Sequence, residues 1–163
     1  MKSTGEVLGV GYTLEEALYK GFIGAYKDPG FDTGKIFVTL NDKDKEGFKG
    51  MALSLKNLGY SFISTENTAK ALKSWGIDSE VVEKLSSGDN KILDIIKNRE
   101  VDFIVNTATK GNDSSRDGFK IRRLGAEFSI EVFTSLDTLE AMLYYKTRKV
   151  SGEELHAINI FED

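Results

Sequence analysis

One stretch constrains the fold more than any other, because it changes abruptly from apolar to polar. Val101-Asp102-Phe103-Ile104-Val105 is followed at once by the polar residues Asn106, Thr107 and Thr109. Consecutive β-branched and aromatic residues are typical of a strand that is covered on both faces, as in a parallel sheet. Open α/β sheets bind ligands beyond the carboxyl ends of their strands. We therefore expect a central strand here, with hydrogen-bonding groups but no strong nucleophile at its end.

Strand and helix patterns alternate from Lys35 onward. Short apolar runs predict strands at 36–40, 60–64, 81–84, 101–105 and 130–133. Apolar residues at helical spacing predict helices between these strands and after the last one. Gly59 and Gly76 are placed to end two of the helices. This alternation implies right-handed crossovers, and it predicts an α/β fold with a five-stranded doubly wound parallel sheet.

The first thirty residues form a separate segment in the predicted organisation. Thr13 followed by Glu16 is a capping-box pattern, so a helix should begin there, and Asp28-Pro29-Gly30 should follow its end. Its expected inward stripe consists of Leu14, Ala17, Leu18, Phe22 and Ala25. We divide the chain into residues 1–30, a domain over residues 31–150 and a charged tail over residues 151–163.

Composition excludes several classes of function. The net charge of -4 argues against a general nucleic-acid surface, although a local phosphate pocket remains compatible with it. With no cysteine, disulfides and thiolate metal sites are excluded. No apolar run is long enough to cross a bilayer, and the first residues lack the apolar region of a signal peptide. We expect a cytoplasmic protein without a membrane partner.

Catalytic and cofactor motifs are missing where they would be expected. Neither Gly-x-x-x-x-Gly-Lys nor Gly-x-Gly-x-x-Gly follows the first strand. His156 is the sole histidine and lies in the tail, which argues against a zinc site or a serine–histidine dyad. Asp89 is the one carboxylate placed to abstract a proton. Arg122-Arg123 lies within a helix, where the side chains can reach a phosphate or form surface ion pairs.

Polar residues at the ends of the predicted strands define a candidate site. Thr65 begins a helix, whose free N–H groups and dipole favour a phosphate, and Lys45 and Lys84 can supply positive charge. Each residue also has a simpler interpretation, since a threonine before a helix is usually a cap and a lysine is usually a solvated surface residue. The candidate effector- and phosphate-binding residues are Lys45, Thr65, Thr68, Lys84, Asn106, Thr107 and Thr109. We predict no catalytic residue and no metal ligand.

Several short segments carry a resemblance to a known family. They are Asp44-Lys45-Glu46, Thr65-Glu66-Asn67-Thr68-Ala69, Val82-Glu83-Lys84, Ile96-Lys97-Asn98, Val105-Asn106-Thr107 and Ile121-Arg122-Arg123. The chain resembles the C-terminal allosteric domain of the carbamoyl-phosphate synthetase large subunit, which has the methylglyoxal-synthase-like, Rossmann-like three-layer fold. The segment Met1–Gly11 is similar to the end of the second ATP-grasp unit that precedes this domain.

This resemblance implies a regulatory domain without catalytic activity of its own. In the family the domain binds a nucleotide effector, UMP or IMP. The residues of this chain that match its phosphate- and nucleoside-binding positions are Lys45, Thr65, Thr68, Lys84, Asn106 and Thr107. Ala108 and the loop Lys110-Gly111-Asn112 depart from the usual pattern. Val132-Phe133-Thr134 lacks the tyrosine of the family's ornithine contact, so we do not transfer ornithine binding.

The resemblance also implies a larger parent protein. That parent would be a glutamine-hydrolysing carbamoyl-phosphate synthase, an ATP-dependent ligase that uses magnesium or manganese and potassium. It would pair with a glutaminase small subunit and serve pyrimidine and arginine biosynthesis. No cofactor is expected in this domain. Two alternatives remain open: a methylglyoxal synthase acting on dihydroxyacetone phosphate through Asp89, although the family's histidines are missing, and a structural domain whose effector site has decayed.

Overall fold

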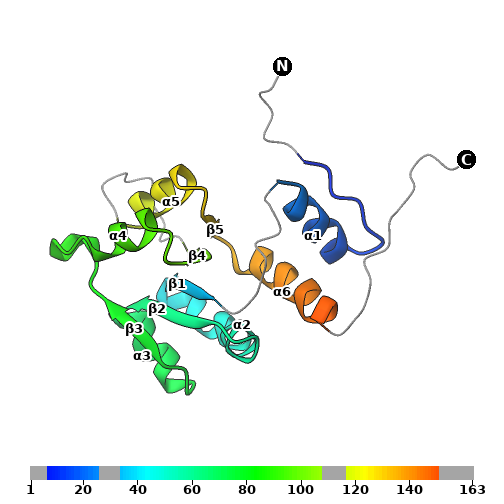
Figure 1. Ribbon diagram of the computed structural model, residues 1–163. Coiled ribbons are helices and arrows are strands. Elements are labelled where there is room, and N and C mark those ends of the chain that lie inside the picture. The colour runs from blue at the N-terminus through cyan, green and yellow to red at the C-terminus, as the bar shows by residue number, and fades with distance from the viewer. Residues whose placement is uncertain (1–6, 26–33, 108–116, 151–163) are drawn as a thin grey trace, which may run out of the picture. The chain divides into compact units, whose positions relative to one another are not determined.

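The arrangement of helices and strands is given by a computed structural model, which describes residues 7–25, 34–107 and 117–150 (Figure 1). The chain forms two compact units, residues 1–30 with residues 137–163, and Phe31–Leu136. Our division into residues 1–30, 31–150 and 151–163 stays a prediction. Within the described ranges, no helix is long and apolar enough to cross a membrane.

The larger unit contains one sheet whose neighbouring strands are all parallel. Its strands are β1 (Lys35–Thr39), β2 (Ser61–Thr65), β3 (Ser79–Val82), β4 (Phe103–Asn106) and β5 (Glu131–Phe133). They lie in the order β3-β2-β1-β4-β5, which confirms the predicted doubly wound α/β fold. The expectation that the strand before Asn106 is central was wrong, because β1 is central and β4 lies beside it. Both strands are covered on both faces, so their composition does not distinguish them.

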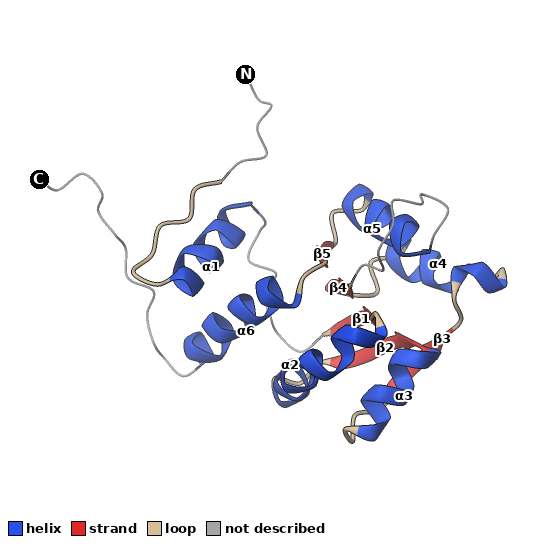
Figure 2. Cartoon of the chain, turned by 180° about the vertical axis from the view of Figure 1, so that it is seen from behind, coloured by secondary structure: helices blue, strands red, loops and turns tan. Residues whose placement is uncertain are grey.

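Two pairs of helices cover the two faces of the sheet (Figures 1 and 2). One face carries α2 (Lys45–Asn57) and α3 (Glu66–Ser74), and the other carries α4 (Lys91–Lys97) and α5 (Asp117–Glu127). The core on the α4 and α5 side joins Phe37, Ile63, Val82, Ile92, Ile95, Ile96, Val101, Ile104, Ile121 and Ile130. Because these residues come from all five strands or their ends and from both helices, they hold the carboxyl edge of the sheet in a fixed position.

The ends of the helices follow the glycine signals. Gly59 has a φ of 90° and Gly76 has a φ of 75°, a backbone region that glycine enters without a steric penalty. The amide of Gly76 donates to the carbonyl of Lys73, and that of Gly59 donates to Lys56. The predicted ends of α2 and α3 are therefore confirmed, and the chain turns there into the following strand or loop.

The smaller unit contains α1 (Leu14–Ala25) and most of α6 (Leu136–Val150). Its predicted start is confirmed, since the amide of Glu16 donates to Thr13 Oγ1 at 3.2 Å. The predicted inward stripe was wrong at Leu14 and Leu18, which are 71% and 44% exposed, whereas Tyr19 is 2% exposed. Neighbouring helix positions are about 100° apart, so a buried face centred on Tyr19 turns Leu18 towards solvent.

Strand β5 places a carboxyl group in an apolar setting at the edge of the sheet. Glu131 pairs in register with the fully buried Phe103 and is itself half-buried. Burial raises the pKa of the Glu131 carboxyl from 4.5 to about 7. A carboxyl group that keeps its proton in the folded state links stability to pH.

We expect Glu131→Gln to remove this pH dependence. Between pH 4.5 and about 7, the unfolded chain releases the Glu131 proton while the folded chain keeps it. Folded-state stability from this group is therefore present below pH 4.5 and lost as the pH rises through about 7. The free energy of unfolding of the variant minus that of the wild type should therefore be about 1–2 kcal/mol larger at pH 8 than at pH 4. This figure allows for partial hydration of the carboxyl group.

Urea unfolding across this pH range measures the difference. Glu127→Gln, at an exposed position on the last turn of α5, is the matched control and should show a constant difference. A difference between wild type and Glu131→Gln that is the same at pH 4 and pH 8 would contradict the raised pKa.

Candidate functional site

A pocket of about 440 Å³ opens at the carboxyl edge of the sheet. From the central strand β1, the chain adds β2 and β3 towards one edge of the sheet and then β4 and β5 towards the opposite edge. This reversal places the switch point between β1 and β4, where open α/β sheets bind ligands. The pocket is lined by Thr39, Leu40, Asn41, Asp42, Thr65, Asn67, Lys84, Ser86, Ile92, Asn106, Thr107, Asp117, Gly118, Phe119, Ile121 and Arg122.

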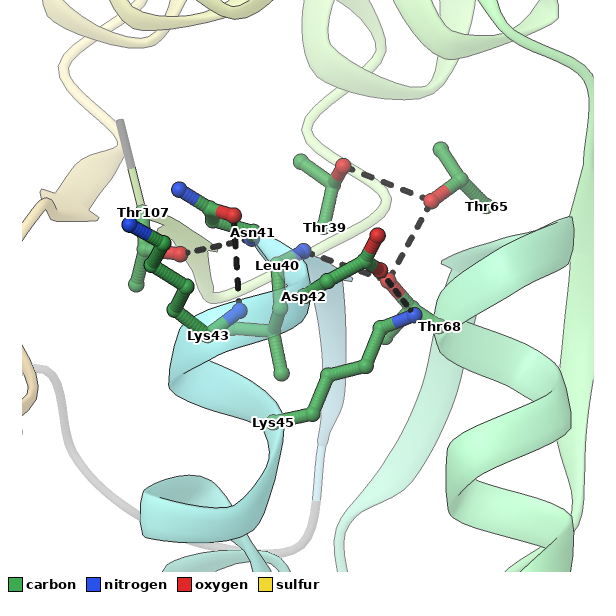
Figure 3. A network of polar contacts seen from close by, with 9 residues as sticks. All are labelled: Thr39, Leu40, Asn41, Asp42, Lys43, Lys45, Thr65, Thr68 and Thr107. Carbon is green, nitrogen blue, oxygen red and sulfur yellow. Dashed lines mark hydrogen bonds and ion pairs between the residues drawn. The ribbon is translucent and has the colours of Figure 1, made fainter. Parts of the chain in front are cut away.

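Three threonine hydroxyls form a network at one side of the pocket (Figure 3). Thr65 Oγ1 lies 3.3 Å from both Thr39 Oγ1 and Thr68 Oγ1. The amide of Leu40 donates to Thr68 Oγ1 at 3.1 Å. Three hydroxyls carry three protons, and the two contacts among them use at most two. The remaining proton is available to an acceptor outside the network, and Thr39 and Thr65 line the pocket.

Thr107 holds the loop that follows β1. The amide of Asn41 donates to Thr107 Oγ1 at 2.9 Å, so this oxygen acts as an acceptor and its own proton is left to donate. Asn41 in turn caps the short helix η1 (Asp42–Asp44) through its Oδ1 and the amide of Lys43. The first loop of the site is thus fixed by Thr68, which lies in α3, and by Thr107, which directly follows β4.

An arginine from α5 reaches the end of β4. Arg122 Nη1 donates to Asn106 Oδ1 at 2.9 Å, and the Asn106 residue is only 2% exposed. Gly118 lies against this pair, since a Cβ there would be 3.2 Å from Arg122 Nη1 and 3.3 Å from Asn106 Oδ1. The guanidinium therefore brings a permanent positive charge to the pocket.

Two lysines lie near the first loop in different settings. Lys45 Nζ is 2.6 Å from Asp42 Oδ1, and the pKa of Asp42 is lowered chiefly by this hydrogen bond, with a smaller contribution from the charge of Lys84. The charge of Lys84 also helps to lower the pKa of Glu66, after the larger effect of Lys70. Among the described residues, Lys84 Nζ itself has no ion-pair partner within 4.0 Å, so its charge is available to a ligand.

The structure brings most of the predicted site residues together. Thr65, Lys84, Asn106 and Thr107 line the pocket. Thr68 is fully buried behind Thr65, where it supports the loop after β1, and Lys45 is paired with the rim residue Asp42. Thr109 lies outside the described residues. The binding roles of these residues stay predictions.

Two expected local roles differ in detail. Thr65 occupies the N-cap position of α3, but its side chain makes no capping hydrogen bond, because the hydroxyl faces Thr39 and Thr68. Asp89 Oδ1 accepts from the amide of Lys91 at 2.9 Å. This local turn gives Asp89 a structural partner at the start of α4, and Asp89 does not line the pocket.

The predicted site left out most of the other lining residues, among them the polar residues Thr39, Asn41 and Arg122. Thr39 ends β1 and Asn41 comes two residues later, so the rule that selected Asn106 at the end of β4 was sufficient to find them. Arg122 had a weaker signal, since neighbouring arginines on a helix reach different directions and the sequence does not tell which one faces the sheet. In the described part of the chain, no group of three histidine, aspartate or glutamate side chains is arranged to hold a metal ion.

Fold and site together define a class of protein: a three-layer α/β domain with a pocket rich in hydrogen-bond donors at the switch point of its sheet. Within that class the family is also clear. Residues 48–134 match the family model of the MGS-like domain, and the chain belongs to this family.

The relatives are large chains of a synthase. The chain is 53% identical over 160 residues to the carbamoyl phosphate synthase large chain of Clostridium botulinum (strain Loch Maree / Type A3), covering 98% of this chain and 15% of that protein. It is 49% identical over 161 residues to the protein of the same name from Clostridium perfringens (strain 13 / Type A), with the same coverage. The chain thus spans about 15% of the length of these curated relatives.

A solved structure has the same fold. Methylglyoxal synthase from Elizabethkingia anophelis NUHP1 matches with a TM-score of 0.57 and 18% identity, covering 69% of this chain and 78% of that one. At this level of identity, the likeness concerns the arrangement of strands and helices.

Proposed function

We propose that this chain is the effector-binding regulatory domain of a carbamoyl-phosphate synthetase large subunit, and that its pocket binds a nucleoside monophosphate such as UMP or IMP. The observation that carries the proposal is the set of donors at the pocket. The threonine network, the Thr107 hydroxyl, Lys84 and Arg122 all offer protons or positive charge.

A phosphate is the group that uses such a set best. It has several strong acceptor oxygens, and charge-assisted hydrogen bonds to them are about twice as strong as neutral ones. Backbone amides at the start of α3 add to this end of the pocket, beside Thr65 and Asn67. The apolar residues Ile92, Phe119 and Ile121 line the same pocket and offer contacts to a flat ring. The polar and apolar residues of the lining therefore suit the two parts of a nucleotide.

The proposal extends to the protein of which the domain would be part. That parent is an ATP-dependent, glutamine-hydrolysing ligase in the cytoplasm, with an ATP-grasp unit before this domain, magnesium or manganese and potassium as ions, and a glutaminase small subunit. This domain would have no cofactor and no catalytic residue. Effector binding would control carbamoyl phosphate synthesis for pyrimidine and arginine biosynthesis, by favouring one state of the whole enzyme over another.

Thermal unfolding of the full chain with added ligands tests the proposal. UMP, IMP, inorganic phosphate and ornithine are added separately over a concentration series. A ligand at about one hundred times its dissociation constant stabilises the folded state by about 2.7 kcal/mol. We expect UMP or IMP to raise the unfolding midpoint, phosphate to raise it less at equal concentration, and ornithine to leave it unchanged.

Two results would contradict the proposal. The absence of any nucleotide effect would favour a structural domain without a working effector site. Conversion of dihydroxyacetone phosphate to methylglyoxal by the purified chain would show an enzyme instead.

A further inference from the structure

We infer that Arg122 fixes the Asn106 side-chain amide so that its NH2 group faces the pocket, which makes Asn106 a selector of ligands with a carbonyl oxygen over ligands with an amino group. The inference rests on the proposed function and specifies the ligand chemistry of the same pocket. It assigns to Arg122 the role of a positioning residue that acts through Asn106.

The orientation of the amide follows from the chemistry of its partner. A guanidinium group carries only donors, so the Asn106 atom that lies 2.9 Å from Arg122 Nη1 has to be the oxygen. The Nδ2 group is then on the other branch of the amide. Among the described residues it has no hydrogen-bond partner, although Asn106 is 2% exposed and lines the pocket. A ligand acceptor is the partner that this NH2 group lacks.

The surroundings of the pair oppose a flip of the amide. A flipped amide would present its NH2 group to the guanidinium, and two donors facing each other in a partly buried setting would lose a hydrogen bond on both sides. A Cβ at Gly118 would come within 3.2 Å of Arg122 Nη1 and 3.3 Å of Asn106 Oδ1, so a side chain at this position would have to displace the pair. The glycine thus allows α5 to bring the arginine close to the end of β4.

Asn106 differs in this respect from the other polar groups around it. The hydroxyls of Thr39, Thr65 and Thr107 can rotate and serve either a donor or an acceptor on a ligand. The locked amide offers the pocket donors alone. Discrimination between an oxo group and an amino group at the same ring position should therefore depend on Asn106 and on the arginine that orients it.

The first experiment examines the hydrogen bond between Arg122 and Asn106, which we call the lock, without any ligand. In NMR spectra at low temperature, a guanidinium held by a hydrogen bond gives separate signals for its Nη protons, because rotation is slow. We expect such signals for Arg122 in the wild type and their loss in Asn106→Leu. Averaged Arg122 signals in the wild type would contradict the lock.

The second experiment measures selectivity by titration with matched nucleotides. UMP and CMP differ by an oxo and an amino group, as do IMP and AMP. We expect the oxo member of at least one pair to bind at least about 10-fold more tightly, because the amino member would leave the buried Asn106 donor without a hydrogen bond. Arg122→Leu should bring the ratio close to one, whereas Arg122→Lys should keep most of it, since an ammonium also donates to Oδ1.

Controls separate the orientation effect from the loss of charge. Arg123→Leu removes the same charge from the exposed neighbouring position and should keep the ratio. Asn106→Asp replaces the donor by an acceptor and should shift the preference towards the amino member. Equal ratios in the wild type and Arg122→Leu would overturn the inference. Failure of every nucleotide to bind the wild type would contradict the proposed function itself, and the guanidinium signals would then decide whether the lock exists.

Discussion

Replacing Lys84 by alanine is expected to weaken the binding of UMP or IMP by about 10- to 100-fold and to leave the fold intact. Lys84 lines the pocket, and within the described residues its ammonium is not held by an ion pair. A charge-assisted hydrogen bond to a phosphate contributes about 1.5–3 kcal/mol, which corresponds to this loss in affinity. The side chain is exposed, so its removal should change the free energy of unfolding by less than about 0.5 kcal/mol.

The backbone at Lys84 should keep its conformation in this variant. Its carbonyl accepts from the amide of Ser87 at 3.0 Å and from Ser87 Oγ at 2.6 Å, and neither bond involves the lysine side chain. Lys97→Ala is the matched control, since it removes an equal charge at an exposed position of α4 outside the pocket. Isothermal titration compares the variants. Equal affinities of Lys84→Ala and Lys97→Ala would remove Lys84 from the phosphate site.

Truncating Phe103 is expected to have the largest effect on stability. The side chain is fully buried in β4, and its ring packs edge-to-face on Tyr60 at 5.6 Å and on Phe133 at 5.4 Å between centroids. Phe103→Ala leaves a cavity that the neighbouring strands cannot fill. Such substitutions destabilise a folded domain by about 3–5 kcal/mol, and the loss of two aromatic contacts adds to this.

Urea unfolding at constant pH measures the change in free energy. Leu53→Ala, on the outer side of α2 where the leucine is 38% exposed, is the control and should cost less than about 1 kcal/mol. In conditions where Phe103→Ala remains folded, we expect its nucleotide affinity to be near that of the wild type, because Phe103 does not line the pocket. A loss of stability equal to that of Leu53→Ala would contradict the described core.

Local patterns were sufficient to predict the elements of the fold. The alternation of apolar runs and helical stripes led to all five strands, and the glycines at 59 and 76 marked two helix ends. Strand order was harder to predict, because β1 and β4 are equally apolar and only the pairing of distant segments distinguishes the centre. The exposed positions of Leu14 and Leu18 were missed for a similar reason, since a broad apolar stripe does not fix which residue faces inward.

The site was predicted in part because strand ends are readable in sequence. Thr65, Lys84, Asn106 and Thr107 were chosen by that rule, and they line one pocket. The different roles of Thr68 and Arg122 depend on contacts between elements far apart in the chain: Thr68 accepts from Leu40, and Arg122 reaches Asn106. The raised pKa of Glu131 likewise comes from burial that no local pattern signals.

The location of nucleotide binding is the central claim, and backbone amide chemical shifts measure it most directly. UMP or IMP is added to the ¹⁵N-labelled full chain, and the amide shifts are followed to saturation. Our account predicts that the largest changes occur in residues 39–43, 65–68 and 106–107, which surround the pocket, with smaller changes at the same amides on adding inorganic phosphate. Changes concentrated away from the carboxyl ends of β1, β2 and β4, or no saturable change at all, would contradict it.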